Sequence, residues 1–195
     1  MGLKIDRKQD KRVVHACTHM LADIPNGVTV CSSELVAGGI LQEGTVLGGK
    51  DDAGLYHVVK TARLTEAATA TTKAYKVAKG YHFKVGDFIM LKVGAKAYKI
   101  TSINTSETLY DTINVGTTLG ETAPAGAALV LAAAESADAT SAFKYVPKAM
   151  TGDSYDVEAL NNHFVTAVTI GQFKESVIPA VSDDIKAALP GISLI

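Results

Sequence analysis

Two histidines and a cysteine alternate near the start of the chain, as His15-x-Cys17-x-His19, and a second cysteine follows at Cys31. Imidazole and thiolate groups are common Zn²⁺ ligands, so these four side chains form a candidate tetrahedral site. On a β-strand, residues two and four apart point to one face. That geometry also separates positions 15 and 19 by about 13 Å, which is too far for one ion without a bend. We therefore favour packed cysteines and ordinary histidines over a metal site.

The cysteine count also allows a Cys17–Cys31 disulfide. The chain begins with a polar segment that lacks the apolar core of a secretory signal. Two cysteines in a chain made in a reducing cytoplasm are more often thiols than a bridge. The sequence therefore favours two reduced cysteines.

Three carboxylates gather in the segment Asp153-x-x-Asp156-x-Glu158. A calcium loop of the EF-hand kind needs more oxygen ligands and a central glycine, so a solvated turn is the preferred interpretation. The sequence contains no Gly-x-Ser-x-Gly, His-Glu-x-x-His, Walker A or dinucleotide-binding glycine pattern. We therefore expect no enzymatic activity and no cofactor. A small enzyme or metalloprotein that uses His15, Cys17 and His19 is the least favoured of three hypotheses for the function; the other two follow below.

The charge balance limits the classes of partner. The 195 residues include 19 Lys and Arg against 20 Asp and Glu, so the chain has no general attraction to nucleic acid or to an anionic membrane. No apolar stretch approaches the roughly 20 residues that span a bilayer. We expect a soluble protein made in a cytoplasm.

Low charge suggests that the chain associates with other chains. Only 20% of residues are charged and 47% are hydrophobic, which predicts an apolar surface of the kind that marks a contact with another chain. The predicted interface comprises apolar residues of the weakly charged C-terminal part, and an ordinary core position is the alternative for each. These residues are Phe164, Val168, Ile170, Phe173 and Ile178.

The elements that carry these residues are predicted to be short β-strands. Residues 81–93 and 97–103 are two apolar, β-branched runs around the link Gly94-Ala-Lys96, which predicts a β-hairpin. In the next predicted strand, 109–115, the odd-numbered residues share one face. Residues 127–131 favour a strand, with a helix as the alternative.

The predicted fold is mainly β, with short-stranded antiparallel subdomains that resemble sandwiches or barrels and with little helix. We divide the chain into a flexible N-terminal arm (1–12), an N-terminal β block (13–64), a central hairpin subdomain (73–133) and a C-terminal β block (142–195), all in one compact multi-part unit. One short helix is expected after Ser182, because a serine cap precedes two acids and Pro190-Gly191 follows.

Three stretches resemble the head fibre and head-decoration proteins of tailed bacteriophages and prophages. They are Gly-Thr-Val-Leu-Gly-Gly-Lys-Asp-Asp-Ala-Gly-Leu-Tyr-His-Val-Val-Lys at 44–60, Phe-Lys-Val-Gly-Asp-Phe-Ile at 83–89 with Ala-Tyr-Lys-Ile-Thr-Ser-Ile at 97–103, and Ala-Phe-Lys-Tyr-Val-Pro at 142–147 with Tyr-Asp-Val at 155–157. The resemblance implies a β-rich virion protein on the capsid exterior, commonly a trimer, without activity or cofactor. Its partners would be its own copies and the major capsid protein.

The chain departs from a fibre in one respect, since it has neither a heptad run nor a fibrous repeat that could build a shaft. A squat decoration, or the base of a fibre, is the form that the resemblance then implies. The second hypothesis is a carbohydrate- or ligand-binding β-module of a bacterial surface protein.

Overall fold

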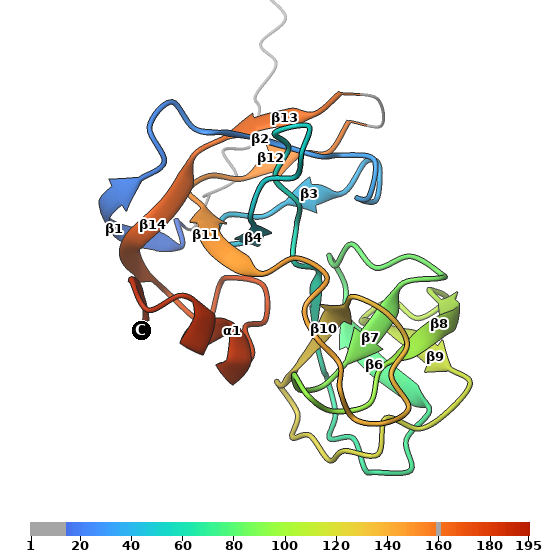
Figure 1. The fold of residues 1–195 in the computed structure, drawn as a ribbon. Helices are drawn as coiled ribbons and strands as arrows, with labels where there is room; N and C mark the ends of the chain where they lie inside the picture. Colours follow the sequence, from blue (N-terminus) through green and yellow to red (C-terminus); the bar gives the residue numbers. More distant parts are fainter. Residues whose placement is uncertain (1–14, 159–160) are drawn as a thin grey trace, which may run out of the picture.

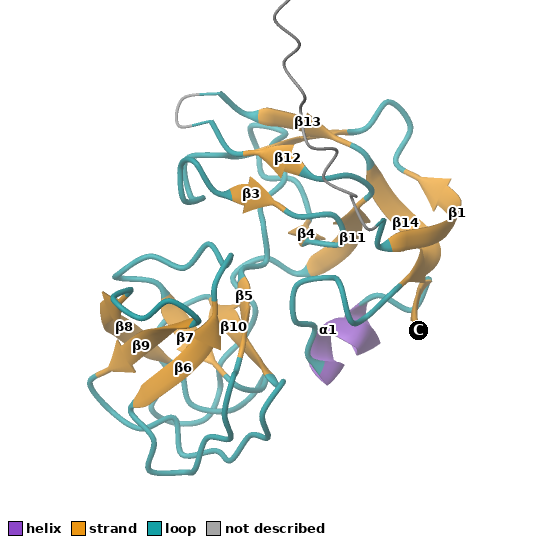
Figure 2. Cartoon of the chain, turned by 180° about the vertical axis from the view of Figure 1, so that it is seen from behind, coloured by secondary structure: helices purple, strands orange, loops and turns teal. Residues whose placement is uncertain are grey.

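The chain folds into two β-rich units that are joined side by side (Figures 1 and 2). The computed structural model describes residues 15–158 and 161–195, and within them it contains fifteen strands and one short helix. The two ends of the chain build one unit, the terminal unit, and the middle of the chain builds the other, the middle unit. This confirms the predicted mainly-β fold. The predicted arm, 1–12, lies outside the described residues.

The terminal unit is held together by strands from both ends of the chain. Its elements are β1 (Cys17–Asp23), β2 (Val28–Val30), β3 (Ile40–Leu41), β4 (Val46–Gly48), β11 (Pro147–Thr151), β12 (Tyr155–Asp156), β13 (His163–Val165), β14 (Ala167–Phe173), α1 (Asp183–Ala188) and β15 (Ile192–Leu194). The main sheet has the order β1-β14-β11-β4, and β15 pairs in parallel with the second half of β14. Two further antiparallel pairs, β2 with β13 and β3 with β12, lie beside it. The N-terminal sequence block up to β4 and the C-terminal block therefore share one unit, whereas residues 61–63 at the end of the predicted block 13–64 belong to the middle unit.

The middle unit is a six-stranded antiparallel sheet. Its strands are β5 (Thr61–Arg63), β6 (Ala74–Ala78), β7 (Phe88–Met90), β8 (Tyr98–Asn104), β9 (Tyr110–Val115) and β10 (Ala128–Ala132). They follow the order β5-β10-β7-β8-β9-β6. A single bridge between Leu64 and Val77 brings the two edges of the sheet together. No continuous ladder joins these edges, so the described sheet is not a closed barrel.

The predicted central hairpin is confirmed, although its first strand, β7, covers only Phe88–Met90 of the predicted run 81–93, so the connection is longer than residues 94–96. β7 and β8 pair antiparallel through Phe88–Lys99 and Ile89–Tyr98, and Gly94 in the connection has a φ of 77°, which favours glycine. In β9 the residues Asp111, Ile113 and Val115 are buried and their neighbours are not, as the alternation predicted. Leu109 precedes the strand and is 84% exposed, so its side chain does not share the buried face.

β10 is buried on both faces, which explains why its sequence shows no alternation. Leu129 and Leu131 pack into the core of the middle unit. Ala128, Val130 and Ala132 pack on the other side, in a core that also contains residues of the terminal unit such as Phe173 and Ile185. The two units therefore share apolar packing across β10.

The C-terminal helix begins where the sequence predicts it. Ser182 is the N-cap of α1, and its side chain accepts a hydrogen bond from the backbone N–H of Ile185. Asp183 and Asp184 occupy the first turn, where carboxylates are favoured by the helix dipole. In the described part of the chain, no helix has the length and apolarity needed to cross a membrane.

Candidate functional site

The His-Cys-His segment lies on or beside the edge strand β1 and is not arranged around a common point. Glu43 is the nearest carboxylate, with His15 Nδ1 3.7 Å from Oε2, but both of its oxygens already accept backbone N–H groups, from Ala16 at 2.9 Å and Cys17 at 2.8 Å. Within 15–158 and 161–195, no three His, Cys, Asp or Glu residues are placed to hold a metal ion. Burial, together with the charge of Glu43, raises the pKa of the Cys17 thiol, which disfavours the reactive thiolate.

The other polar candidates from the sequence are likewise dispersed. Cys17 and Cys31 are both free thiols in the structure. Asp153 accepts a long hydrogen bond from Thr166 Oγ1, at 3.4 Å. Glu158 instead accepts from the side-chain amide of Asn161, at 2.7 Å. These groups bind their own neighbours and do not form a shared cation site.

The structure divides the five predicted interface residues into two groups. Val168, Phe173 and Ile178 are less than 5% exposed and belong to the core that the two units share. They are therefore enclosed within the chain itself and are not available to a second chain. Phe164 is 64% exposed and Ile170 is 46% exposed, so only these two remain on the surface. Phe164 and Ile170 do not lie on one continuous strand, because β13 ends at Val165 and β14 starts at Ala167, in a different sheet.

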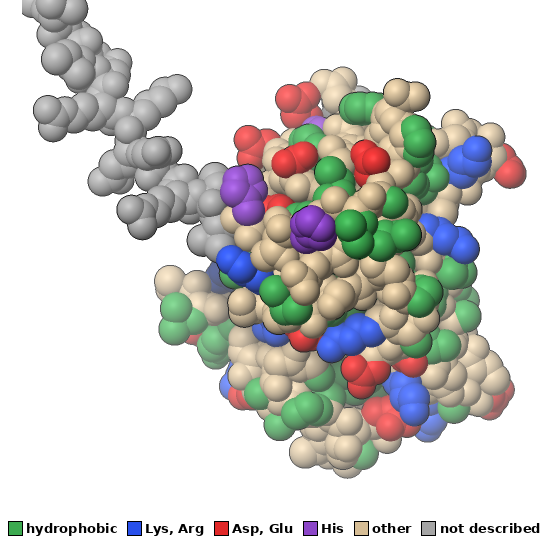
Figure 3. All heavy atoms as spheres, turned by 90° about the vertical axis from the view of Figure 1, so that its left-hand side faces the viewer, with side chains coloured by type: hydrophobic (Ala, Val, Ile, Leu, Met, Phe, Trp, Pro, Cys, Tyr) green, Lys and Arg blue, Asp and Glu red, His purple; other side chains and the backbone are tan. Residues whose placement is uncertain are grey.

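An apolar surface lies around the outer edge of the terminal unit. We define it by Met20 and Leu21 on β1, Phe164 on β13 and Ile170 on β14, and each of these side chains is at least 46% exposed. Met20 and Ala22 pair with Gly171 and Ile170 across the sheet, so β1 and β14 present their exposed side chains on adjacent strands. Figure 3 shows this side of the molecule, where hydrophobic side chains lie in separate groups among backbone, polar, acidic, basic and histidine side chains.

The densest polar constellation lies where the chain passes between the units, and sequence reasoning missed it. Glu34 Oε1 accepts hydrogen bonds from the Tyr145 hydroxyl at 2.6 Å and from Lys144 Nζ at 2.8 Å. Its Oε2 lies 3.0 Å from Nδ1 of His57, whose Nε2 lies 3.1 Å from Asp51 Oδ2. The rings of His57 and Tyr145 stack with centroids 4.2 Å apart. We call these five residues the junction cluster.

The junction cluster shifts the ionisation of its members. Burial alone would raise the pKa of Glu34, but hydrogen bonds from Lys144, Tyr145 and His57 lower it to about 2. Burial and the bond to Glu34 raise the pKa of Tyr145 to about 12. The cluster is therefore built from a carboxylate and a neutral phenol that stabilise each other.

This arrangement holds the segments together and offers no obvious route for catalysis. Both ring nitrogens of His57 are bonded to carboxylates, so neither is left to exchange a proton with a substrate. The ring is also covered on one face by Tyr145 and is 8% exposed. Its members come from the segments after β2, between β4 and β5, and between β10 and β11. No local spacing in the sequence could have revealed residues so far apart.

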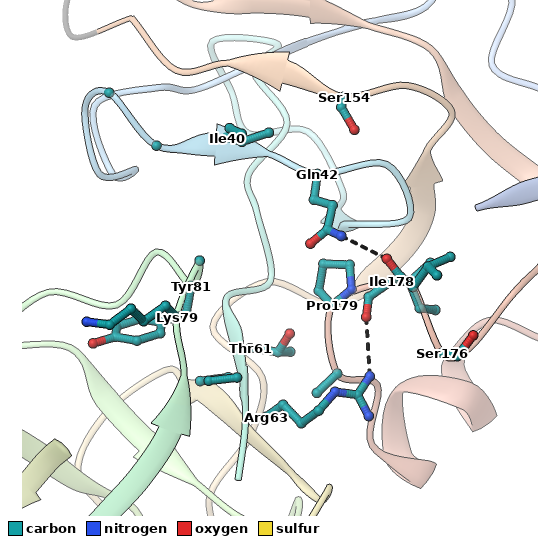
Figure 4. Close-up of a pocket in the computed structure, with 17 residues that line it drawn as sticks. Ile40, Gln42, Thr61, Arg63, Lys79, Tyr81, Ser154, Ser176, Ile178 and Pro179 are labelled. Atoms are coloured by element: carbon teal, nitrogen blue, oxygen red, sulfur yellow. Dashed lines mark hydrogen bonds between the residues drawn. The ribbon is translucent and has the colours of Figure 1, made fainter. Parts of the chain in front are cut away.

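A cleft of about 910 Å³ separates the two units (Figure 4). One wall carries Ile40, Gln42 and Ser154, the floor carries Thr61 and Arg63 of β5, the opposite wall carries Lys79 and Tyr81, and the loop before α1 closes the remaining side with residues 176–180. Arg63 Nη2 donates to the carbonyl oxygen of Ile178 at 3.2 Å, and Gln42 Nε2 donates to that of Val177 at 2.8 Å. These two bonds tie the loop to both units.

A second hollow of about 440 Å³ adjoins the cleft behind Tyr81. Asp111 accepts hydrogen bonds there from Lys79 and, at 2.8 Å, from the hydroxyl of Tyr81. Burial and this bond raise the pKa of Tyr81 well above its ordinary value, so the phenol is a neutral donor. His82 joins the middle unit to the terminal unit. Its Nδ1 accepts a hydrogen bond from the Val36 N–H at 3.4 Å, and its Nε2 lies 3.0 Å from the Ile40 carbonyl oxygen.

No protein-family model, curated protein or solved structure matches this chain.

Proposed function

We propose that the chain is a non-enzymatic structural protein of a tailed-phage virion. It decorates the outside of the capsid, as a head fibre or the base of one, and is made in the cytoplasm of the bacterial host. Its work is adhesion, through apolar self-association, as a trimer in the first instance, and through attachment to the major capsid protein. The sequence stretches that resemble head fibre and head-decoration proteins support this proposal, and the mainly-β fold agrees with it.

The observation that carries the proposal is the apolar surface of the terminal unit. Met20, Leu21, Phe164 and Ile170 expose large side chains on three strands of one unit, of which β1 and β14 are adjacent, and burial of these side chains against another chain would be favourable. β1 is the edge of the main sheet as described. Its pairing with β14 shifts register at three places, and such bulges discourage strand addition. We infer that copies meet through side chains and not through a continuous sheet.

Subunit number tests this proposal. Multi-angle light scattering of the wild-type chain should give a trimer, and Leu21→Glu and Phe164→Glu should each shift it towards a monomer with unchanged circular dichroism. Leu109→Glu is the matched control, because Leu109 is 84% exposed on the middle unit and should leave assembly intact. A wild-type chain that stays monomeric at high concentration, or surface variants that assemble normally, would count against the proposal. Detection of the chain in purified phage particles by mass spectrometry tests its location.

A carbohydrate- or ligand-binding β-module is the second candidate function. The cleft favours it, because 910 Å³ lies within the range of small-molecule sites and such sites often form between units of a fold. Binding by a monomer, without any assembly, would separate this candidate from the first.

A further inference from the structure

The cleft between the units has an unbalanced lining charge. Its lining includes the cations Arg63 and Lys79 and contains no carboxylate side chain. Lys79 forms an ion pair with Asp111, which lies in the adjoining hollow. Arg63 forms no ion pair with any carboxylate in 15–158 or 161–195. The net charge that a ligand would meet in the cleft is therefore that of the Arg63 guanidinium.

The guanidinium is held in place but has donors to spare. Nη2 donates to the carbonyl oxygens of Glu175 at 3.4 Å and Ile178 at 3.2 Å, and these are the hydrogen bonds that its side chain makes in the structure. A guanidinium carries five N–H donors, so most remain for another partner. Arg63 is half-buried on β5, where its charge is less well hydrated than on an open surface. A fixed, partly desolvated guanidinium is well suited to bind an oxyanion through two parallel hydrogen bonds.

The remaining side chains that line the cleft are partly apolar and partly polar. Hydroxyl and amide groups come from Gln42, Thr61, Ser154 and Ser176, and they alternate with apolar patches. Two such patches, Tyr81 and Pro179, are placed on different walls in Figure 4. A sugar ring has this same mixture of hydroxyl edges and apolar faces, whereas a fatty acid would need a continuous apolar lining. The size of the cleft leaves room for more than one ring.

We propose that the cleft binds an acidic oligosaccharide, with a uronic-acid carboxylate on Arg63 and ring hydroxyls on the neighbouring polar side chains. This inference does not depend on the assembly proposal, because the cleft lies within one chain and away from the apolar surface. It narrows the second candidate function to one class of ligand.

Isothermal titration calorimetry of the full chain with trigalacturonic acid tests the inference. Maltotriose serves as the neutral saccharide of the same length, and inorganic phosphate serves as the bare anion. The wild-type chain should bind trigalacturonic acid more tightly than either. Arg63→Gln should weaken that binding by at least about tenfold, since it removes a charge-assisted pair. Lys99→Gln removes an exposed cation outside the cleft and should bind as the wild type does.

A second variant keeps the test decisive if Arg63→Gln does not fold. Ser176 is exposed at the rim, so Ser176→Glu should fold normally and repel the acidic ligand while leaving the apolar surface intact. Absence of trigalacturonate binding by the wild type, equal binding of maltotriose or phosphate, or unchanged binding by Ser176→Glu would each overturn the inference. Light scattering on the same samples reports on assembly separately.

Discussion

The phenolic oxygen of Tyr145 lies 2.6 Å from Oε1 of Glu34, and this bond joins segments that are 111 residues apart in the chain. Tyr145 belongs to the segment that returns from the middle unit, and Glu34 belongs to the terminal unit. The same carboxylate is hydrogen-bonded to His57, which lies on the segment that enters the middle unit. The Glu34 side chain therefore forms hydrogen bonds to both segments that connect the two units.

The acid stability of the chain should depend on Glu34. Its pKa is lowered to about 2 in the folded state, against about 4.3 for an unperturbed glutamate. A lowered pKa contributes stability that is complete above about pH 4.3 and is lost as the pH falls towards 2. Because the side chain is 24% exposed, we expect a contribution of about 1–3 kcal/mol. Urea unfolding of Glu34→Gln should show lower stability at pH 7 and a flatter decline between pH 4.5 and 2 than the wild type. An unchanged acid slope would contradict the assignment.

Tyr145→Phe should destabilise the chain and should be coupled to Glu34. The substitution removes the hydroxyl that donates to Glu34 and retains the ring that stacks on His57. We expect a loss of about 1–2 kcal/mol, because a hydrogen bond to a charged acceptor is lost. In a double-mutant cycle with Glu34→Gln, the double variant should lose about 1 kcal/mol less stability than the sum of the two single losses. Tyr110→Phe, at a hydroxyl without a hydrogen bond to the described residues, is the matched control. Additive losses would show that the Tyr145–Glu34 hydrogen bond contributes no coupling energy to stability.

The fold was largely accessible from local patterns. Alternation in 110–115, the hairpin around Gly94 and the cap at Ser182 each depend on neighbours in sequence, and the structure confirms them. β14 was harder, because Gly171-Gln172 has the composition of a turn but lies inside a continuous strand. Gly171 is required there by close packing, since a Cβ would lie 2.8 Å from the carbonyl oxygen of His19.

The candidate sites depend on long-range packing, which local patterns do not encode. Phe164 and Phe173 are both apolar residues of strand-like segments, yet one is 64% exposed and the other is fully buried. Only the arrangement of the sheets separates them, because β14 lies between β1 and β11 whereas β13 pairs with β2 alone. Arg63 likewise gave no signal in the sequence, since its place in the cleft follows from the docking of the two units.

His82 should make the contact between the units sensitive to pH. Burial is the main cause that lowers the pKa of this histidine, and the nearby Lys60 and Lys84 lower it further, against the effect of its bond to Ile40. Lys60 is itself paired with Asp87. A lowered pKa gives stability that is complete above about pH 6.5 and is lost as the pH falls below it.

Protonation of His82 at Nδ1 would also end its acceptance of a hydrogen bond from the Val36 N–H. Hydrogen exchange at Val36 should therefore accelerate between pH 6.5 and 5 after correction for intrinsic rates, and His82→Gln should abolish that step. A wild type without the step would argue against this role.

In the buried ion pair Lys60–Asp87, removal of the aspartate charge should cost more stability than removal of the lysine charge. Lys60 Nζ lies 2.8 Å from Asp87 Oδ2, and its side chain is 3% exposed against 16% for the aspartate. Asp87→Asn leaves an ammonium group without its counter-ion, and we expect it to cost about 3–5 kcal/mol. Lys60→Met should cost less, because the remaining carboxylate is better hydrated and still accepts the Lys84 N–H at 2.9 Å. The double variant should be more stable than Asp87→Asn alone, since it removes the unpaired charge. Asp138→Asn, at an exposed position, is the control for loss of a carboxylate. Chemical denaturation at pH 7 measures all four, and equal losses for both single variants would show that the lysine is not effectively desolvated.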